Sequence, residues 1–198
     1  MRRSFRCEIS LEMSDQLAHD HRELDKLLDE LQSLLQSGTA KEIHRCLDFF
    51  WARLAVHIRA EHLGLFPAVI RAFESRPENG AETPCLTEAQ SLIAELRQDH
   101  DFFMHQLSRG IASVRTSLSA GESDLRNNQL ANLKRRIAAV TDRLASHNKL
   151  EEEGIYLWVG ALLSQREQSD LRALVREELA NLPPRFVQSD LSDYLATD

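Results

Sequence analysis

The chain has 198 residues, of which 42% are hydrophobic and 28% charged, and its formal net charge at pH 7 is −7. These values fit a single folded domain, and the acidic balance argues against a nucleic-acid-binding surface, which would need clustered Lys and Arg. No apolar run has the length of a signal peptide or a membrane span, so we expect a cytoplasmic protein with no membrane partner. Cys7, Cys46 and Cys85 lie far apart, which argues against a disulfide framework or a zinc ribbon.

Glycines and prolines are few and lie mostly between runs of periodic hydrophobic residues, so we predict a mainly helical chain. Residues 1–13 show no clear period and are predicted to be a lead-in segment. Capping residues and turns predict five helices, which begin at or soon after Ser14, Thr39, Thr87, residues 120–123 and Ser164. Pro67 predicts a kink in the second helix, residues 77–84 a long loop, and Pro183 the end of the fifth helix.

Each of the first four predicted helices carries an apolar stripe at spacings of three and four, and one histidine falls on each stripe. These histidines are His21, His57, His100 and His147. Counting residues from the turns brings the first three to matching heights, and a long or irregular turn is needed to bring His147 level with them. We therefore predict an all-α bundle with the four histidines pointing inward.

A short motif occurs twice in the chain. Residues 57–61 and 147–151 both read His-x-x-x-Glu, and a glycine follows three residues later in each copy, at Gly64 and Gly154. Residues four apart project from one face of a helix, so Glu61 and Glu151 are predicted to lie beside the inward histidines. The recurrence indicates an internal duplication around one site. The two glycines either permit close helix packing or leave room near the site, and the sequence favours neither.

Six ionisable residues thus occupy inward positions where a bundle would place leucine. Burying an unpartnered carboxylate costs several kcal/mol, so the group needs compensation. A polar hydrogen-bond network explains any one of these histidines well, but six residues at one level favour metal ions. Imidazole and carboxylate ligands suit iron, manganese or zinc, and two carboxylates can bridge two ions. Without metal, we expect the buried carboxylates to take up protons.

The other histidines and one further glutamate are predicted not to be ligands. His19, His44, His62 and His105 are expected at the surface or beside the ligands. Glu152 is expected on the exposed face, with contact to a ligand as the alternative.

Taken together, these residues resemble the hemerythrin-like, or HHE cation-binding, domains. The family pattern falls on His21, on His57 and Glu61 followed by Leu65-Phe66-Pro67, on His100, and on His147 with Glu151. The resemblance covers roughly residues 14–163 and implies an up-down four-helix bundle. The predicted additional C-terminal helix and polar tail, over residues 164–198, lie outside the resemblance. It further implies a non-haem centre of two iron ions, bridged by Glu61 and Glu151, that binds small diatomic molecules or small anions, or that uses iron itself as a signal.

One departure from the family concerns the third helix, where hemerythrin has a second histidine and this chain has Met104. A thioether is a poor ligand for ferric iron, so we expect an open position on one iron, walled by Phe103, Phe50 and Trp158. The preferred reading is a sensor or carrier of oxygen, nitric oxide or iron rather than an enzyme. The alternatives are a di-iron oxidase, peroxidase or nitric-oxide-linked iron-sulfur repair factor, and a bundle that acts only by docking a protein partner.

Overall fold

The computed structural model describes residues 4–75 and 85–186, and the side chains within these ranges from residue 16 onward. The chain forms, in order, α1 (Ser4–Ser37), α2 (Ala40–Ala60), η1 (Glu61–Leu65), α3 (Phe66–Glu74), α4 (Leu86–Ser119), α5 (Asn127–Leu150), η2 (Glu151–Ile155), α6 (Tyr156–Leu162), α7 (Gln165–Ala180) and η3 (Pro184–Phe186). The elements η1 and η2 are π-helical turns, and η3 is a short 3₁₀ helix.

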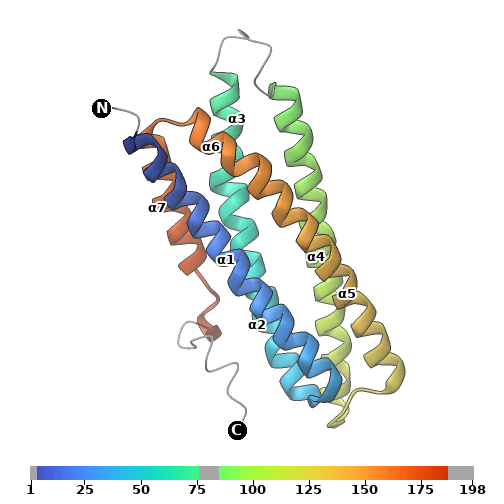
Figure 1. Cartoon of the computed structure of the whole chain (residues 1–198). Coiled ribbons are helices and arrows are strands. Elements are labelled where there is room, and N and C mark those ends of the chain that lie inside the picture. The colour runs from blue at the N-terminus through green and yellow to red at the C-terminus, as the bar shows by residue number, and fades with distance from the viewer. Residues whose placement is uncertain (1–3, 76–84, 187–198) are drawn as a thin grey trace.

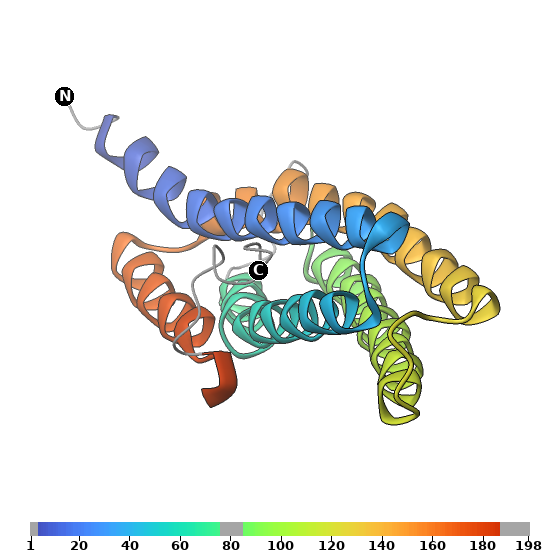
Figure 2. The same cartoon turned by 90° about the horizontal axis from the view of Figure 1, so that it is seen from below.

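The described residues form four long helical rods and one shorter helix beside them (Figure 1). The first rod is α1, the second runs through α2, η1 and α3, the third is α4, and the fourth runs through α5, η2 and α6. The rods pack against one another around the bundle: α1 contacts α2 and α5, α4 contacts the same two helices, and α3 also contacts α6. Figure 2 shows α1 and α5–α6 on one side of the bundle and α2–α3 and α4 on the other. The predicted up-down four-helix bundle is therefore confirmed.

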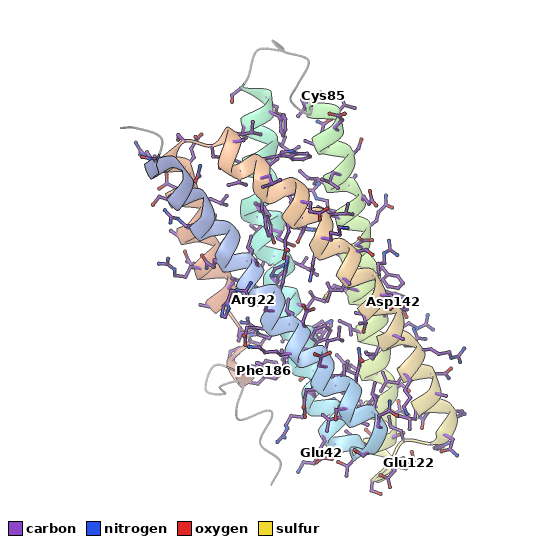
Figure 3. The ribbon with its side chains drawn as sticks, viewed as in Figure 1. Arg22, Glu42, Cys85, Glu122, Asp142 and Phe186 are labelled. Atoms are coloured by element: carbon purple, nitrogen blue, oxygen red, sulfur yellow. The ribbon has the colours of Figure 1, made fainter. Side chains whose placement is uncertain are left out.

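The ends of the bundle are marked by the labelled side chains of Figure 3. Glu42 in the first turn of α2 and Glu122 in the α4–α5 connection lie at one end, and Cys85, which precedes α4, lies at the other. At the first end the two connections are joined directly, because the Ala40 N–H donates to the Ser123 carbonyl at 2.8 Å. Among the described helices, none is long and apolar enough to cross a membrane.

Two hydrophobic clusters fill the bundle, with a polar layer between them. Leu24, Leu54, Phe103 and Leu144 belong to the cluster nearer the α1–α2 and α4–α5 connections. Leu17, Ala60, Leu96 and Ile155 belong to the cluster nearer α3, α6 and α7. On every rod the predicted histidine lies between a residue of the first cluster and a residue of the second. The apolar packing on both sides therefore holds the polar layer at one height.

The helix α7 packs on the outside of α1, α2 and η1, which confirms the predicted additional helix. The capping box that predicted its start is present, since the Ser164 N–H donates to the Glu167 carboxylate at 2.8 Å. The side chains of Leu171 and Val175 are buried against the bundle. A Cβ atom on Gly64 would lie 2.7 Å from Cδ2 of Leu174 and 3.2 Å from Cδ1 of Leu171. Close packing of α7 thus accounts for Gly64. The polar tail beyond residue 186 lies outside the described residues.

Two predicted helix starts are wrong. The first helix begins at Ser4 rather than Ser14. Residues 4–13 contain neither glycine nor proline, and a serine can lie inside a helix as well as at its start. The helix α4 begins at Leu86 rather than after Thr87, because Glu88 accepts a hydrogen bond from the Cys85 N–H at 2.7 Å and caps the helix earlier. The capping box at Thr39 is confirmed. The predicted loop at residues 77–84 lies outside the described residues.

Candidate metal centre

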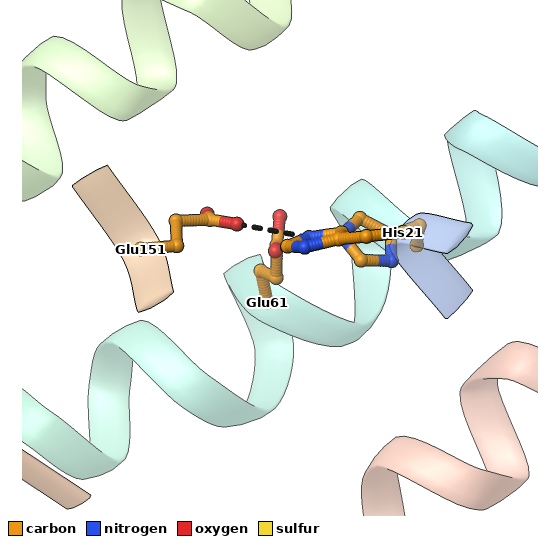
Figure 4. Close-up of side chains that lie close together, drawn as sticks. His21, Glu61 and Glu151 are labelled. Carbon is orange, nitrogen blue, oxygen red and sulfur yellow. Dashed lines mark hydrogen bonds and ion pairs between the residues drawn. The ribbon is translucent and has the colours of Figure 1, made fainter. Parts of the chain in front are cut away.

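The six residues singled out by the sequence converge in the polar layer. They make two overlapping sets in which all donor atoms lie within 4.8 Å of one another: His21, His57, Glu61 and Glu151, and Glu61, His100, His147 and Glu151. All six side chains are buried, and both glutamates belong to both sets. Below, the first set is called the His21/His57 cluster and the second the His100/His147 cluster. Figure 4 shows the carboxylates of Glu61 and Glu151 converging on His21.

The predicted heights of the four histidines agree with the structure. The Nε2 atoms of His21 and His57 lie 3.2 Å apart, and those of His100 and His147 lie 3.0 Å apart. The sequence placed His147 farther from the turn between the third and fourth helices than His100. In the structure the irregular connection at residues 120–126 removes this difference, because His100 lies 19 residues before the end of α4 and His147 lies 20 residues after the start of α5.

The carboxylate of Glu61 is shared between the two clusters. Its Oε1 lies 2.9 Å from Nε2 of His57, and its Oε2 lies 3.2 Å from Nε2 of His100. One oxygen atom therefore faces each cluster. A carboxylate held in this way can bind two cations at once, one through each oxygen.

Glu151 is divided in the same manner. Its Oε2 lies 3.3 Å from Nε2 of His21, and its Oε1 lies 3.3 Å from Nε2 of His147. The two glutamates thus face both clusters from opposite rods. Bulk water does not solvate either carboxylate, since both side chains are fully buried.

Each shared glutamate begins a π-helical turn. The Phe66 N–H donates to the Glu61 carbonyl, and the Tyr156 N–H donates to the Glu151 carbonyl, five residues back in both cases. In the second rod this turn comes directly before the proline from which a kink was predicted, since Pro67 is the second residue of α3. The fourth rod has the same turn without a proline, so the turn belongs to the repeated motif. Wide turns of this kind occur frequently at functional sites.

Buried aspartates orient two of the histidines. Nδ1 of His57 donates to the Asp20 carboxylate at 2.8 Å, and Asp20 also pairs with Arg53. The other half repeats this arrangement: Nδ1 of His147 faces the Asp99 carboxylate at 3.2 Å, and Asp99 pairs with Arg143. The sequence analysis missed these four residues. Their signal is present, because an aspartate directly precedes both His21 and His100, and an arginine lies four residues before both His57 and His147.

The residue that follows each shared glutamate contacts the remaining two histidines. Nδ1 of His21 lies 3.0 Å from the carboxylate of Glu152, and Nδ1 of His100 lies 2.9 Å from Nε2 of His62. Glu152 is therefore in contact with a candidate ligand, which was the alternative left open by the sequence. His19 and His105 are exposed, as expected.

Charge within the polar layer sets the protonation of the metal-free protein. Burial favours the neutral form of His57, but the charge of Glu61 and hydrogen bonds to Asp20 and Glu61 outweigh it and raise the pKa of His57 well above its usual value. Burial likewise favours protonation of Glu61, but the charge of His57 and hydrogen bonds from His100 and His57 hold the pKa of Glu61 well below its usual value. The expectation that the buried carboxylates take up protons is therefore wrong for Glu61, because a histidine carries the proton instead.

The donor atoms fit a cation better than a hydrogen-bond network. Nδ1 of His21, of His57 and of His147 each faces a carboxylate, which can only accept, so Nδ1 carries a proton. In the neutral imidazole that a cation requires, Nε2 is then left as a lone-pair donor. In that form the Nε2 lone pairs of His21 and His57 face each other over 3.2 Å, and the Nε2 atoms of His100 and His147 lie 3.0 Å apart. Among the described residues, both oxygens of Glu61 and Oε1 of Glu151 face only Nε2 atoms of the histidines, which cannot donate to them once the histidines are neutral with Nδ1 protonated. A cation in each cluster would satisfy all of these atoms.

Comparison with known proteins supports the same class of site. The family model described as Hemerythrin HHE cation binding domain matches residues 9–69. The match contains His21, His57 and Glu61, and it confirms the family resemblance over the first half of the bundle. The second half of the site rests on the repeated residues and their geometry. No curated protein and no solved structure matches the chain. The family and the geometry together indicate a cation-binding bundle.

Proposed function

We propose that this chain, whose residues 9–69 match the hemerythrin HHE cation binding domain, is a non-haem di-iron protein that senses or carries a small ligand such as oxygen, nitric oxide or a small anion. The proposed protein ligands are His21, His57, Glu61, His100, His147 and Glu151. Iron held by imidazole and carboxylate groups supplies reversible binding of diatomic molecules and anions.

One observation carries the proposal: each buried glutamate presents one oxygen to the His21/His57 cluster and the other to the His100/His147 cluster. A single-metal site would need only one such cluster. Two carboxylates facing both clusters, with two histidines on either side, match the needs of two adjacent divalent or trivalent cations. Manganese and zinc accept the same donor types, so the metal identity rests on the family description and on measurement.

The surroundings of the His100/His147 cluster favour a small ligand over a large one. The Phe66 ring stacks on His100 with centroids 5.9 Å apart, and the Phe103 ring meets His147 edge-on at 5.4 Å. These two rings, rather than Trp158, wall the cluster, since Trp158 packs against Phe73. Aromatic walls disfavour bulky polar molecules next to the cluster, because such molecules would lose their hydration there.

A surface groove leads towards the same cluster. It lies between α3 and α4, has a volume of about 600 Å³ and is lined in part by Phe66, Arg71 and Arg97. The Arg97 guanidinium lies over the Phe66 ring at 5.8 Å. One aromatic ring therefore separates a positively charged groove from His100. We infer that small anions and diatomic molecules enter along this route.

Metal analysis combined with spectroscopy tests the proposal. The purified protein, loaded with iron, is expected to hold close to two irons per chain and to change its visible spectrum on addition of azide or nitric oxide. Protein that binds no metal would refute the proposal. Steady consumption of oxygen, peroxide or nitric oxide by the iron-loaded protein would instead favour the di-iron enzyme.

A further inference from the structure

The two halves of the centre differ at one pair of corresponding positions. Five residues after Glu61 the chain has Phe66, and five residues after Glu151 it has Tyr156. Both rings stack on the facing histidine with centroids 5.9 Å apart, Phe66 on His100 and Tyr156 on His21. The two aromatic positions are therefore equivalent in place, and they differ by a single hydroxyl group.

That hydroxyl lies among the donor atoms of the His21/His57 cluster. The Oη atom of Tyr156 is 3.2 Å from Nε2 of His21 and 3.4 Å from Oε2 of Glu151. Ligands that lie about 2.1 Å from one ion at roughly right angles are about 3 Å apart. The other donor atoms of this cluster show the same spacing, for example 3.2 Å between His21 and His57. Oη thus occupies a position suited to a ligand of the same ion.

The surroundings of Tyr156 offer its hydroxyl no better partner. The side chain is buried, and the distance of 3.4 Å to Glu151 exceeds the usual 2.5–3.0 Å of an O–H···O hydrogen bond. Once a cation binds the lone pair of His21, that nitrogen no longer accepts a hydrogen bond. The hydroxyl would then be a poorly satisfied buried group unless it also binds the cation. Phe66 has no hydroxyl group, so it places no polar atom at the His100/His147 cluster.

We propose that Tyr156 is a fifth protein ligand of the ion in the His21/His57 cluster, bound through its phenolate oxygen. This proposal rests on the proposed function, because it requires iron in the cluster. A phenolate is a hard anionic oxygen donor, which suits ferric iron. On binding, the O–H bond breaks, the proton leaves to solvent and the oxygen lone pair forms the bond to iron.

The two ions would then differ. The ion in the His21/His57 cluster would have five protein ligands, and the ion in the His100/His147 cluster would have four, because Phe66 supplies none. The open position for an added ligand is accordingly assigned to the His100/His147 cluster, on the side of the groove between α3 and α4.

The test uses the tyrosine content of the chain, which has only Tyr156 and Tyr194. Ferric wild type, Tyr156→Phe and Tyr194→Phe are compared by iron content, visible absorption and resonance Raman spectroscopy. We expect a tyrosinate-to-iron charge-transfer band with enhanced tyrosine ring vibrations in the wild type and in Tyr194→Phe. We expect complete loss of both signals in Tyr156→Phe, with two irons per chain retained in all three proteins.

The outcomes separate the two proposals. A wild type with two irons and no tyrosinate signal overturns the Tyr156 assignment and leaves the di-iron function standing. A signal that survives Tyr156→Phe also overturns it. A wild type that binds no iron refutes the di-iron function itself.

Discussion

The carboxylate of Asp20 lies 2.8 Å from Nδ1 of His57, and the residue directly after Asp20 is the candidate ligand His21. One turn of α1 therefore supplies a candidate ligand of the cluster and also the group that orients its neighbour from α2. The same relation holds between Asp99 and His147, with His100 following Asp99. A carboxylate in this position fixes the tautomer of the imidazole and makes its other nitrogen a stronger donor.

Replacement of either aspartate is expected to weaken metal binding without unfolding the bundle. Asp20→Asn and Asp99→Asn keep the size of the side chain and remove the charge, and loss of such a partner typically costs about 10–100-fold in metal affinity. Competition with a chromophoric chelator measures the affinity, and circular dichroism checks the fold. Asp101→Asn is the matched control, because Asp101 is exposed on the same helix as Asp99. Equal affinities for all three variants and the wild type would show that the aspartates do not support the ligands.

The stability of the metal-free protein is expected to depend on pH in a defined direction. The pKa of His57 is raised above its usual 6.5, so its contribution to stability is fully present below about pH 6.5 and is lost as the pH rises through the raised pKa. The pKa of Glu61 is lowered below its usual 4.5, so its contribution is present above about pH 4.5 and is lost as the pH falls through the lowered pKa. The melting temperature of the metal-free protein should therefore be highest between these values.

Bound metal should reverse the alkaline part of this trend. Metal ions need the neutral form of the histidines, so affinity increases with pH, and metal at a hundredfold excess over Kd adds about 2.7 kcal/mol to the free energy of unfolding. Melting curves with and without chelator at pH 5.5 and pH 8 test this, with the larger difference expected at pH 8. The variant His105→Gln should behave as the wild type, since His105 is exposed. Superimposable curves with and without chelator at both pH values would argue against a metal site in the core.

The candidate ligands could be predicted from the sequence and the residues around them could not, for a physical reason. His21, His57, His100 and His147 fall on apolar stripes, so the helical period alone turns them inward. Asp20 and Asp99 lie next to the stripes, where an acidic residue is normally solvated. In the structure they are buried and are paired with an arginine and a histidine of the neighbouring rod, Asp20 with Arg53 and His57, and Asp99 with Arg143 and His147. A pairing between rods cannot be read from the period of one helix.

The π-helical turns illustrate the same limit. Gly64 and Gly154 predicted either close helix packing or room near the site, but a glycine alone does not reveal that its helix contains a wide turn or which neighbour packs against it. The structure shows both effects: Gly64 lies in η1 and against α7, and Gly154 lies in η2, where an added Cβ would be 3.1 Å from Cδ2 of Leu92. The start of α1 at Ser4 was missed because residues 4–13 show no clear hydrophobic period, which is the pattern that predicts a helix.

Met104 offers a test of the proposed open position. It lies one turn after His100 and is half-buried, and its thioether is a poor ligand for ferric iron. Met104→His is expected to fill the open position and to weaken azide binding, measured by titration of the visible spectrum of the iron-loaded protein. Met104→Leu keeps a non-ligand of similar size and should bind azide as the wild type does. Identical titrations for Met104→His and wild type would contradict the assignment of an open position to the His100/His147 cluster.

The central claim is that Glu61 and Glu151 each bind two ions, and metal content tests it most directly. Elemental analysis compares iron-loaded wild type with Glu61→Ala, Glu151→Ala, His21→Ala and His147→Ala, each confirmed as folded. The wild type should hold two irons per chain. Either glutamate variant should lose more iron than either histidine variant, because each glutamate faces both clusters and each histidine faces one. Two irons per chain retained in both glutamate variants would contradict the account.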